Sequence, residues 1–439
     1  MTPAAKLAAA IEVFGNLESE RRPANDALKA WGLAHRFAGS GDRAGIAGLV
    51  YDALRRRASS AWLMGADTPR AILLGMLKRE RGFDTETISK LADGSGYGPE
   101  ALTEDERLRL DVADMTSAPA HVAGDYPEWL EPHFTRAFGD ASAEEGAALA
   151  SRAPLDLRVN TLKADTFKAA AMLSDLKPEQ GHWSPWALRI RLGADAKSPA
   201  IHAEPAFLKG MIEVQDEGSQ LAALFSGAKP GEQVVDLCAG AGGKTLALAA
   251  MMQNKGQVFA TDDDKRRLAP IHDRLARSGA RNVQVRTPKS VGGEMDDLTG
   301  KCDLVLIDAP CTGTGSWRRN PDAKWRMRPG ALEQRQKEQV EILDRAVTLL
   351  KAGGRIAYVT CSVLDEENGA QVRTFLARNT EFSVQPPADV AKKLGESASK
   401  FTKAGRLSDE GILMTPRTTD TDGFFVSVLR RGLKAEIPG

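Results

Sequence analysis

From Pro230 onward, short apolar runs rich in β-branched residues alternate with turns and helical stretches. Strands are predicted at residues 234–238, 258–262, 283–286, 304–308 and 355–360, with a late strand at 424–429. Strands that alternate with helices form a parallel sheet with both faces covered. The pattern therefore predicts a doubly wound α/β domain. The carboxyl ends of its strands should open into one crevice, where ligands bind in such folds.

Two regions of different texture precede this domain. Residues 1–115 carry apolar residues at helical spacing, as in Ile46, Val50 and Leu54, and predict an all-α domain. Residues 116–225 mix helices with two alternating strands, at 155–160 and 186–192, and predict a small α+β module. The α/β domain is then expected to span residues 226–439. Three domains agree with a length of 439 residues at ~100–200 residues per domain.

Composition and charge exclude several classes of protein. The chain is 42% hydrophobic and 27% charged, as in soluble globular proteins. No apolar run reaches the ~18 residues of a membrane span, and the first residues become charged too early for a secretory signal. We therefore expect a cytoplasmic protein without a membrane partner, and a monomer by default. The formal net charge of +0 does not indicate a nucleic-acid partner, but local basic patches decide such binding.

A glycine-rich turn follows the first strand of the predicted sheet. Glycine lets the backbone approach a ligand, and a helix N-terminus offers unpaired N–H groups. A phosphate-binding loop requires glycine where Cys238 stands, and a dinucleotide-binding turn requires a third glycine where Thr245 stands. S-adenosylmethionine fits better, because it carries a ribose and no phosphate, and Asp262 at the end of the next strand can accept both ribose hydroxyls. The candidate cofactor contacts in the turn are Cys238, Ala239, Gly240, Ala241, Gly242, Gly243 and Lys244.

The four cysteines, at positions 238, 302, 311 and 361, form no CxxC pair. This spacing argues against a zinc site and against a disulfide framework. Cys311 follows the fourth strand of the sheet and Cys361 ends the fifth. Since neighbouring strand ends share one crevice, both thiols should face a single site beside the cofactor. Cys302 is expected to be a small buried hydrophobic residue, and Cys238 to pack within the glycine-rich turn.

Two thiols and a carboxylate beside a methyl donor suit the methylation of carbon 5 of cytosine. This carbon becomes nucleophilic only after a thiolate adds to carbon 6. The proton at carbon 5 must then leave and the thiol must be expelled. A second group helps this elimination. A carboxyl group such as that of Asp308 can stabilise the charge that develops at N3 and the exocyclic amine.

These segments resemble the RNA cytosine-C5 methyltransferases related to Nop2 and the Sun proteins. The resemblance implies that Cys361 is the nucleophile and that Cys311 assists product release. It also implies that Asp308 contacts the base beside the cofactor and that Asp262 holds the ribose. The segments are QDEGSQLAALF (215–225), DLCAGAGGKT (236–245), TDDDKRRL (261–268), DAPCTGTG (308–315) and TCSVLDEEN (360–368), and they cover the chain from about residue 150 to its end.

The chain departs from this family at one point. Similar enzymes usually carry an aspartate after the third strand that contacts the edge of the adenine. Here the stretch is Arg286-Thr287-Pro288-Lys289-Ser290, without a carboxylate. Recognition of the adenine is therefore expected to use backbone groups or to be weaker.

The N-terminal helices resemble the NusB-like RNA-binding domain fused to one bacterial member of the family. GDRA at 41–44 and LVYDALRRR at 49–57 carry this resemblance, which implies 16S ribosomal RNA as the substrate. Two alternatives stay open. One is a methyltransferase that acts on tRNA, and the other is a non-catalytic RNA-binding or ribosome-assembly factor.

The basic segment 316–328 follows Cys311 directly. Arg318, Arg319 and Lys324 are predicted to hold phosphates or orient the nucleotide, while Trp317 or Trp325 stacks on a base. Arg158 lies in a stretch that resembles the RNA-facing module of the family. The target base must leave its stack to reach Cys361.

Overall fold

The computed structural model describes residues 1–20, 22–193, 199–288 and 293–433. Its contacts form two compact units: one is built mainly from residues 1–152 and 317–328, and the other from the remaining described residues. The grouping differs from the division expected from the sequence, because residues 116–152 pack with the N-terminal helices and residues 153–192 pack with the predicted α/β domain. The boundaries at 115 and 225 stay predictions.

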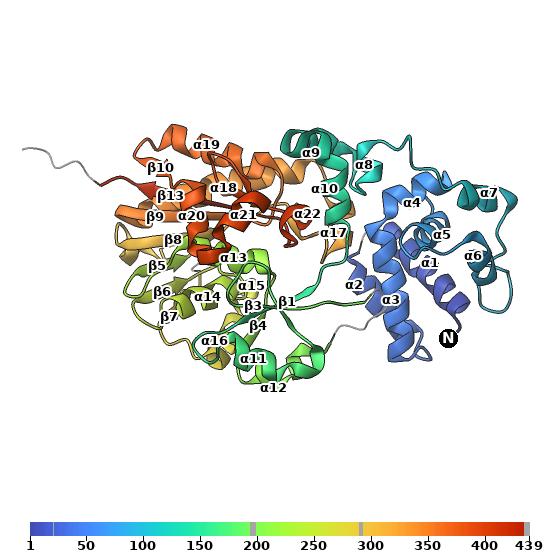
Figure 1. The fold of residues 1–439 in the computed structure, drawn as a ribbon, viewed down its shortest axis with the longest axis horizontal. Helices are drawn as coiled ribbons and strands as arrows, with labels where there is room; N and C mark the ends of the chain where they lie inside the picture. Colours follow the sequence, from blue (N-terminus) through green and yellow to red (C-terminus); the bar gives the residue numbers. More distant parts are fainter. Residues whose placement is uncertain (21, 194–198, 289–292, 434–439) are drawn as a thin grey trace, which may run out of the picture. The chain divides into compact units, whose positions relative to one another are not determined.

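The described residues of the first unit contain helices and no strand, and for residues 1–115 this confirms the predicted all-α fold (Figure 1, blue to cyan). Phe14, Ile46, Val50 and Ile72 lie in its core. Ile46, Val50 and Leu54 of α3 recur at helical spacing and are buried, as are two charged residues of its last turn, Asp52 and Arg55. The helices of the unit are α1 (Pro3–Glu20), α2 (Ala24–Ala34), α3 (Ser40–Arg55), α4 (Arg57–Met64), α5 (Pro69–Arg79), α6 (Thr85–Leu91), α7 (Glu104–Val112), α8 (Ala120–Ala123), α9 (Glu131–Phe138), α10 (Ser142–Leu149) and α17 (Pro321–Arg326).

The second unit contains the predicted doubly wound sheet. The strand order is β11-β12-β13-β9-β8-β5-β6-β7, with β10 paired to β13. The five strands from β9 to β7 in this order are parallel, and β13 is antiparallel to β9, which confirms the Rossmann-like fold. The strands are β5 (Gln233–Asp236), β6 (Gln257–Ala260), β7 (Val283–Val285), β8 (Cys302–Asp308), β9 (Leu350–Thr360), β10 (Phe382–Val384), β11 (Arg406–Leu407), β12 (Ile412–Met414) and β13 (Phe424–Arg431).

Helices cover both faces of this sheet (Figure 1). Val235 of β5 packs in one cluster with Leu343 and Phe375, whereas its neighbour Val234 packs in another with Leu248. Both faces of a central strand are therefore buried, as expected for a parallel sheet. The helices of the unit are α11 (Thr166–Met172), α12 (Pro205–Leu208), α13 (Glu217–Ser226), α14 (Gly243–Met251), α15 (Lys265–Leu268), α16 (Ile271–Ser278), α18 (Gly330–Leu349), α19 (Gly369–Arg378), α20 (Pro387–Ala391), α21 (Ala398–Ala404) and α22 (Pro416–Thr419).

A small antiparallel sheet, of order β2-β3-β1-β4, packs within the same unit. Buried Arg189 of β3 donates hydrogen bonds to Asp156 of β1 at 2.7 Å and to Glu217 of α13 at 3.3 Å. These ion pairs fix the small sheet against the helix that precedes β5. Its strands are β1 (Leu155–Val159), β2 (Glu179–Gln180), β3 (Ala187–Ile190) and β4 (Ile212–Val214).

Candidate active site

The turns that follow β8 and β9 bring Cys311 and Cys361 together. Their Sγ atoms lie 3.3 Å apart. The Ala309 N–H donates to the carbonyl of Val359 at 2.8 Å, and the Gly315 N–H donates to the carbonyl of Cys361 at 2.9 Å. These backbone bonds extend the parallel pairing beyond the strands, so the two thiols lie at one edge of the sheet, as expected from adjacent strand ends.

The surroundings of Cys311 disfavour its thiolate form. The pKa of Cys311 is raised well above its usual value, first by the hydrogen bond to Cys361 and then by burial and the charge of Glu367. A raised pKa keeps Cys311 in the thiol form. Because the bond joins two sulfurs, a thiol at Cys311 can donate to a thiolate at Cys361.

Glu367 is a fully buried carboxylate behind the Cys311 turn, and the sequence analysis assigned it no role. It accepts hydrogen bonds from the Thr312 N–H at 2.8 Å, from the Thr312 hydroxyl, and from Gln339 Nε2 at 3.1 Å. Gln339 also donates to the carbonyl of Pro310 at 3.0 Å. Burial raises the pKa of Glu367, although its hydrogen bonds oppose this. The motif TCSVLDEEN contains Glu367, which was the only signal available in the sequence.

Asp308, at the end of β8, forms an ion pair with Lys244. Lys244 Nζ lies 2.7 Å from Asp308 Oδ2 and 5.1 Å from the centre of the Phe424 ring. The lysine side chain is buried, whereas that of the aspartate is 35% exposed. The glycine-rich turn is thereby tied to the strand end that carries Cys311.

The glycine-rich turn has the backbone that its sequence predicts. Gly240 and Gly242 have φ angles of 49° and 82°, in the left-handed region that glycine favours. A Cβ on Gly242 would lie 2.5 Å from Cγ1 of Ile271. The Gly240 N–H donates to Asp262 Oδ2 at 2.9 Å. The turn therefore lies directly against the carboxylate at the end of β6.

A cavity of about 520 Å³ adjoins this carboxylate. It is lined by Cys238 and Pro310 from the turns after β5 and β8, by Asp262 after β6, and by Arg345 of α18. Asp262 is 3% exposed, and its orientation is fixed by the N–H groups of Gly240 and Asp264. A fixed carboxylate beside a cavity and two glycines suits a ligand with a pair of hydroxyls.

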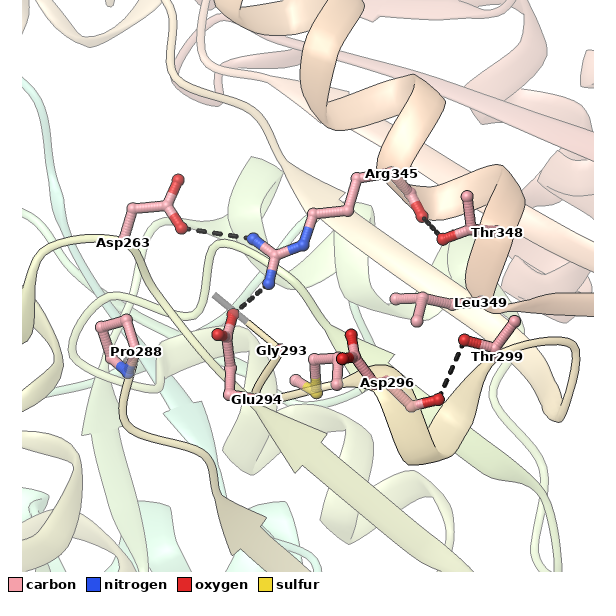
Figure 2. Close-up of a pocket in the computed structure, with 10 residues that line it drawn as sticks. Asp263, Pro288, Gly293, Glu294, Asp296, Thr299, Arg345, Thr348 and Leu349 are labelled. Carbon is pink, nitrogen blue, oxygen red and sulfur yellow. Dashed lines mark hydrogen bonds and ion pairs between the residues drawn. The ribbon is translucent and has the colours of Figure 1, made fainter. Parts of the chain in front are cut away.

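A second cavity, of about 350 Å³, shares two residues with the first (Figure 2). These shared residues are Asp263 and Arg345. Figure 2 shows the guanidinium of Arg345 between the carboxylates of Asp263 and Glu294, with both of which it forms ion pairs.

The segment after β7 supplies no replacement for the missing aspartate in its described part. Arg286 donates to Asp297 and to the carbonyl of Glu294, each at 2.9 Å, so its guanidinium is engaged in holding the loop. Lys289 and Ser290 lie outside the described residues.

The structure corrects the predicted RNA contacts of two cations and one tryptophan in the basic segment. Lys324 is fully buried, and its Nζ donates to the carbonyls of Arg55 and Asp125 at 3.0 and 2.6 Å. Arg318 is 2% exposed, so its guanidinium is too buried to contact a phosphate. Trp317 is 1% exposed and stacks on Phe134. All three residues are buried within the first unit, where α17 packs against α3.

Two further residues proposed from the sequence have clear positions. Arg158 is 2% exposed, so the expectation that it contacts RNA is also corrected. Burial lowers the pKa of Arg158 to about 10, and the negative charge of Glu213 opposes this. Cys302 is buried, as predicted, with its thiol directed at the carbonyl of Leu298. Arg319 is only partly buried, so it stays a candidate contact.

Among the described residues, no helix is long and apolar enough to span a membrane, and no group of three or more His, Cys, Asp or Glu side chains could hold a metal ion.

Comparison with known proteins adds an independent result. The family model described as 16S rRNA methyltransferase RsmB/F matches residues 224–430. The ribosomal RNA small subunit methyltransferase B of Citrobacter koseri is 33% identical over 309 residues, which cover 69% of this chain and 66% of that protein. The probable ribosomal RNA small subunit methyltransferase B of Bacillus subtilis is 30% identical over the same length, with coverages of 70% and 66%. The chain thus spans about two thirds of these curated relatives.

Solved structures agree on the fold. The crystal structure of PH0851 superposes with a TM-score of 0.69 at 25% identity, and covers 98% of this chain and 99% of that one. A methyltransferase homolog protein from Pyrococcus horikoshii gives a TM-score of 0.57 at 26% identity, with coverages of 71% and 97%.

Proposed function

Because this chain belongs to the 16S rRNA methyltransferase RsmB/F family, we propose that it methylates carbon 5 of a cytosine in 16S ribosomal RNA with S-adenosylmethionine as the methyl donor. The observation that carries the proposal is the 3.3 Å separation of two thiols at adjacent strand ends. Addition to a pyrimidine needs one thiol as nucleophile and a second thiol beside it can assist release, whereas an RNA-binding factor needs neither.

The glycine-rich turn and Asp262 are the residues that would hold S-adenosylmethionine. The group fits them, because the turn leaves no side chain at Gly240 or Gly242 and the buried carboxylate of Asp262 borders a cavity of about 520 Å³. When bound, S-adenosylmethionine supplies the electrophilic methyl group. Lys244 would fix the position of Asp308 beside it.

Each thiol has a separate role in this proposal. The sulfur of Cys361 forms a bond to carbon 6 of the cytosine. After carbon 5 has been methylated, a base takes the proton of carbon 5 and the double bond between carbons 5 and 6 forms again. The bond between carbon 6 and sulfur breaks in the same step, which releases Cys361 as a thiolate together with the product. Cys311 assists this release. Asp308 can accept a hydrogen bond from the exocyclic amine of the base and so orient the ring.

Contacts to the RNA backbone are proposed for the exposed end of the basic segment. Arg326 and Arg328 are exposed, and Arg319 is partly so. Together they offer the phosphate contacts that the sequence analysis expected of the whole segment. The N-terminal helices are proposed to contribute to RNA binding, by their resemblance to NusB-like domains.

Incubation with a methyl-labelled donor and either 16S ribosomal RNA or tRNA tests the proposal. We expect label in 5-methylcytosine of 16S ribosomal RNA only. Label in tRNA alone would support the tRNA alternative. Donor binding without transfer to either RNA would support the non-catalytic factor.

Cysteine variants test the roles of the two thiols. Cys361→Ala should abolish methylation, whereas Cys311→Ala should trap a covalent protein–RNA adduct that migrates slowly under denaturing conditions. Cys302→Ala is the matched control, since this thiol lies in the core away from the cavity. An adduct that persists in Cys361→Ala would show that the roles are reversed.

A further inference from the structure

The second cavity continues from the cavity proposed to hold the methyl donor. The two cavities share Asp263 and Arg345, and only the first borders Asp262, the proposed ribose contact. A ligand whose ribose lies at Asp262 would therefore direct its base toward Arg345. Figure 2 shows Glu294, which lines the second cavity, paired with this guanidinium.

Arg345 is held in a fixed position by two carboxylates. It projects from α18, lies 3.3 Å from Asp263, and forms a closer ion pair with Glu294. The Glu294 side chain is 5% exposed and that of Arg345 is 32% exposed, whereas Asp263 is 78% exposed. A buried carboxylate paired with a half-buried guanidinium is a rigid donor–acceptor pair, while exposed Asp263 is free to move aside.

Apolar side chains beside the pair suit a flat ring. Met295 and Leu349 line the second cavity together with Pro288, and Ile342 and Pro310 line the first. Ring faces can pack against these groups while polar ring edges meet the ion pair. Ligand pockets commonly combine apolar walls with a few fixed polar groups in this way.

The edge of adenine is complementary to such a pair. Its exocyclic amine donates and its N1 accepts, so a carboxylate and a guanidinium side by side match both groups. We propose that Glu294 and Arg345 recognise the adenine of the methyl donor, in place of the aspartate that the segment after β7 lacks. The inference rests on the proposed function, because it takes S-adenosylmethionine as the ligand.

Hypoxanthine presents the opposite edge, with an acceptor at O6 and a donor at N1. A site built to match adenine rejects hypoxanthine, because the polar groups of the site would be left unpaired. The Glu294–Arg345 pair is therefore proposed to determine specificity for the adenine base, and it has no role at the reacting atoms.

Calorimetric binding of S-adenosylhomocysteine and S-inosylhomocysteine tests the inference without turnover. The variant is Glu294→Leu with Arg345→Met, which removes both partners together and leaves no buried charge unpaired. Asp344→Asn is the matched control. Asp344 lies on α18, as Arg345 does, but it pairs at the surface with Arg378 of α19. Thermal melting of each variant confirms that it is folded.

We expect the unaltered chain to prefer the adenosyl compound. The affinity of the double variant for S-adenosylhomocysteine should fall about 10-fold or more, which is the value of one charge-assisted hydrogen bond. Its preference for the adenosyl compound over the inosyl compound should also decrease. The single variant Arg345→Lys, which keeps a cation, should fall between the two. Unchanged affinities and an unchanged preference in the folded double variant would overturn the inference. If the unaltered chain bound neither compound, the proposed cofactor itself would be wrong.

Discussion

Removal of the Glu367 carboxylate should slow release of the RNA and spare the formation of the covalent adduct. Glu367 holds the Cys311 turn through the N–H and hydroxyl of Thr312, and it has no polar contact with Cys361 in the described residues. In Glu367→Ala the N–H of Thr312 loses its acceptor. The turn that carries Cys311 should then relax, while the backbone bond at Cys361 stays in place.

The magnitude follows from the contacts that are lost. A donor left without its partner in a buried place costs about 1–3 kcal/mol. If that cost falls on the release step, the rate should drop by about 5–150-fold, at 1.36 kcal/mol per tenfold. Glu367→Gln keeps an oxygen for the Thr312 N–H, so its effect should be smaller. The loss of negative charge in both variants should also lower the pKa of Cys311.

Quenched time courses on denaturing gels measure the formation and decay of the adduct separately. Rates of alkylation against pH report the pKa of Cys311. Asp365→Asn is the matched control, because this neighbouring carboxylate pairs with Arg373 on the surface. Adduct decay at the original rate in Glu367→Ala would refute the positioning role, as would equal slowing of both steps.

Two further predictions concern the glycine-rich turn and the first unit. Gly242→Ala should abolish detectable donor binding in calorimetry, since its Cβ would lie 2.5 Å from Ile271 at a φ of 82°. Gly231→Ala controls for backbone strain, because Gly231 also has a positive φ but has open space for a Cβ. An equal loss of donor binding in both variants would contradict this account. Burial lowers the pKa of Lys324 to about 7, below the ~10.4 of an unfolded lysine. Between these values the unfolded state binds more protons, so this lysine makes stability rise with pH, by at most about 1.4 kcal/mol per unit. Urea unfolding of Lys324→Met should show a smaller rise between about pH 7 and 9, and an equal rise would show that Lys324 is not neutral when folded.

Much of the second unit could be predicted because its signals are local. Strand runs, the glycine-rich turn and the two strand-end cysteines each occupy a few consecutive residues. The rule that parallel strands open at one edge then places Cys311 beside Cys361. Glu367 was missed because its partners Thr312 and Gln339 lie on two segments that are distant from it in sequence.

The basic segment shows where local reasoning fails. Arginine, lysine and tryptophan in sequence indicate a nucleic-acid surface, since such residues are usually exposed. Lys324 is nevertheless buried, because two backbone carbonyls from α3 and the α8 region accept hydrogen bonds from its Nζ. Nothing in residues 317–328 announces those acceptors, which lie about 200 and 270 residues earlier in the chain.

The sequence by itself determined the order of strands and helices, the conformation of the glycine-rich turn, and the chemistry available at the two thiols. These depend on periodicity, on backbone freedom and on side-chain type, which are properties of neighbouring residues. Only the tertiary structure decided which charged groups face a ligand and which are buried. Arg345 and Lys324 are both basic residues on helices, yet one lines a cavity and the other lies in a core. That difference depends on partners distant in sequence, whose positions are set by packing.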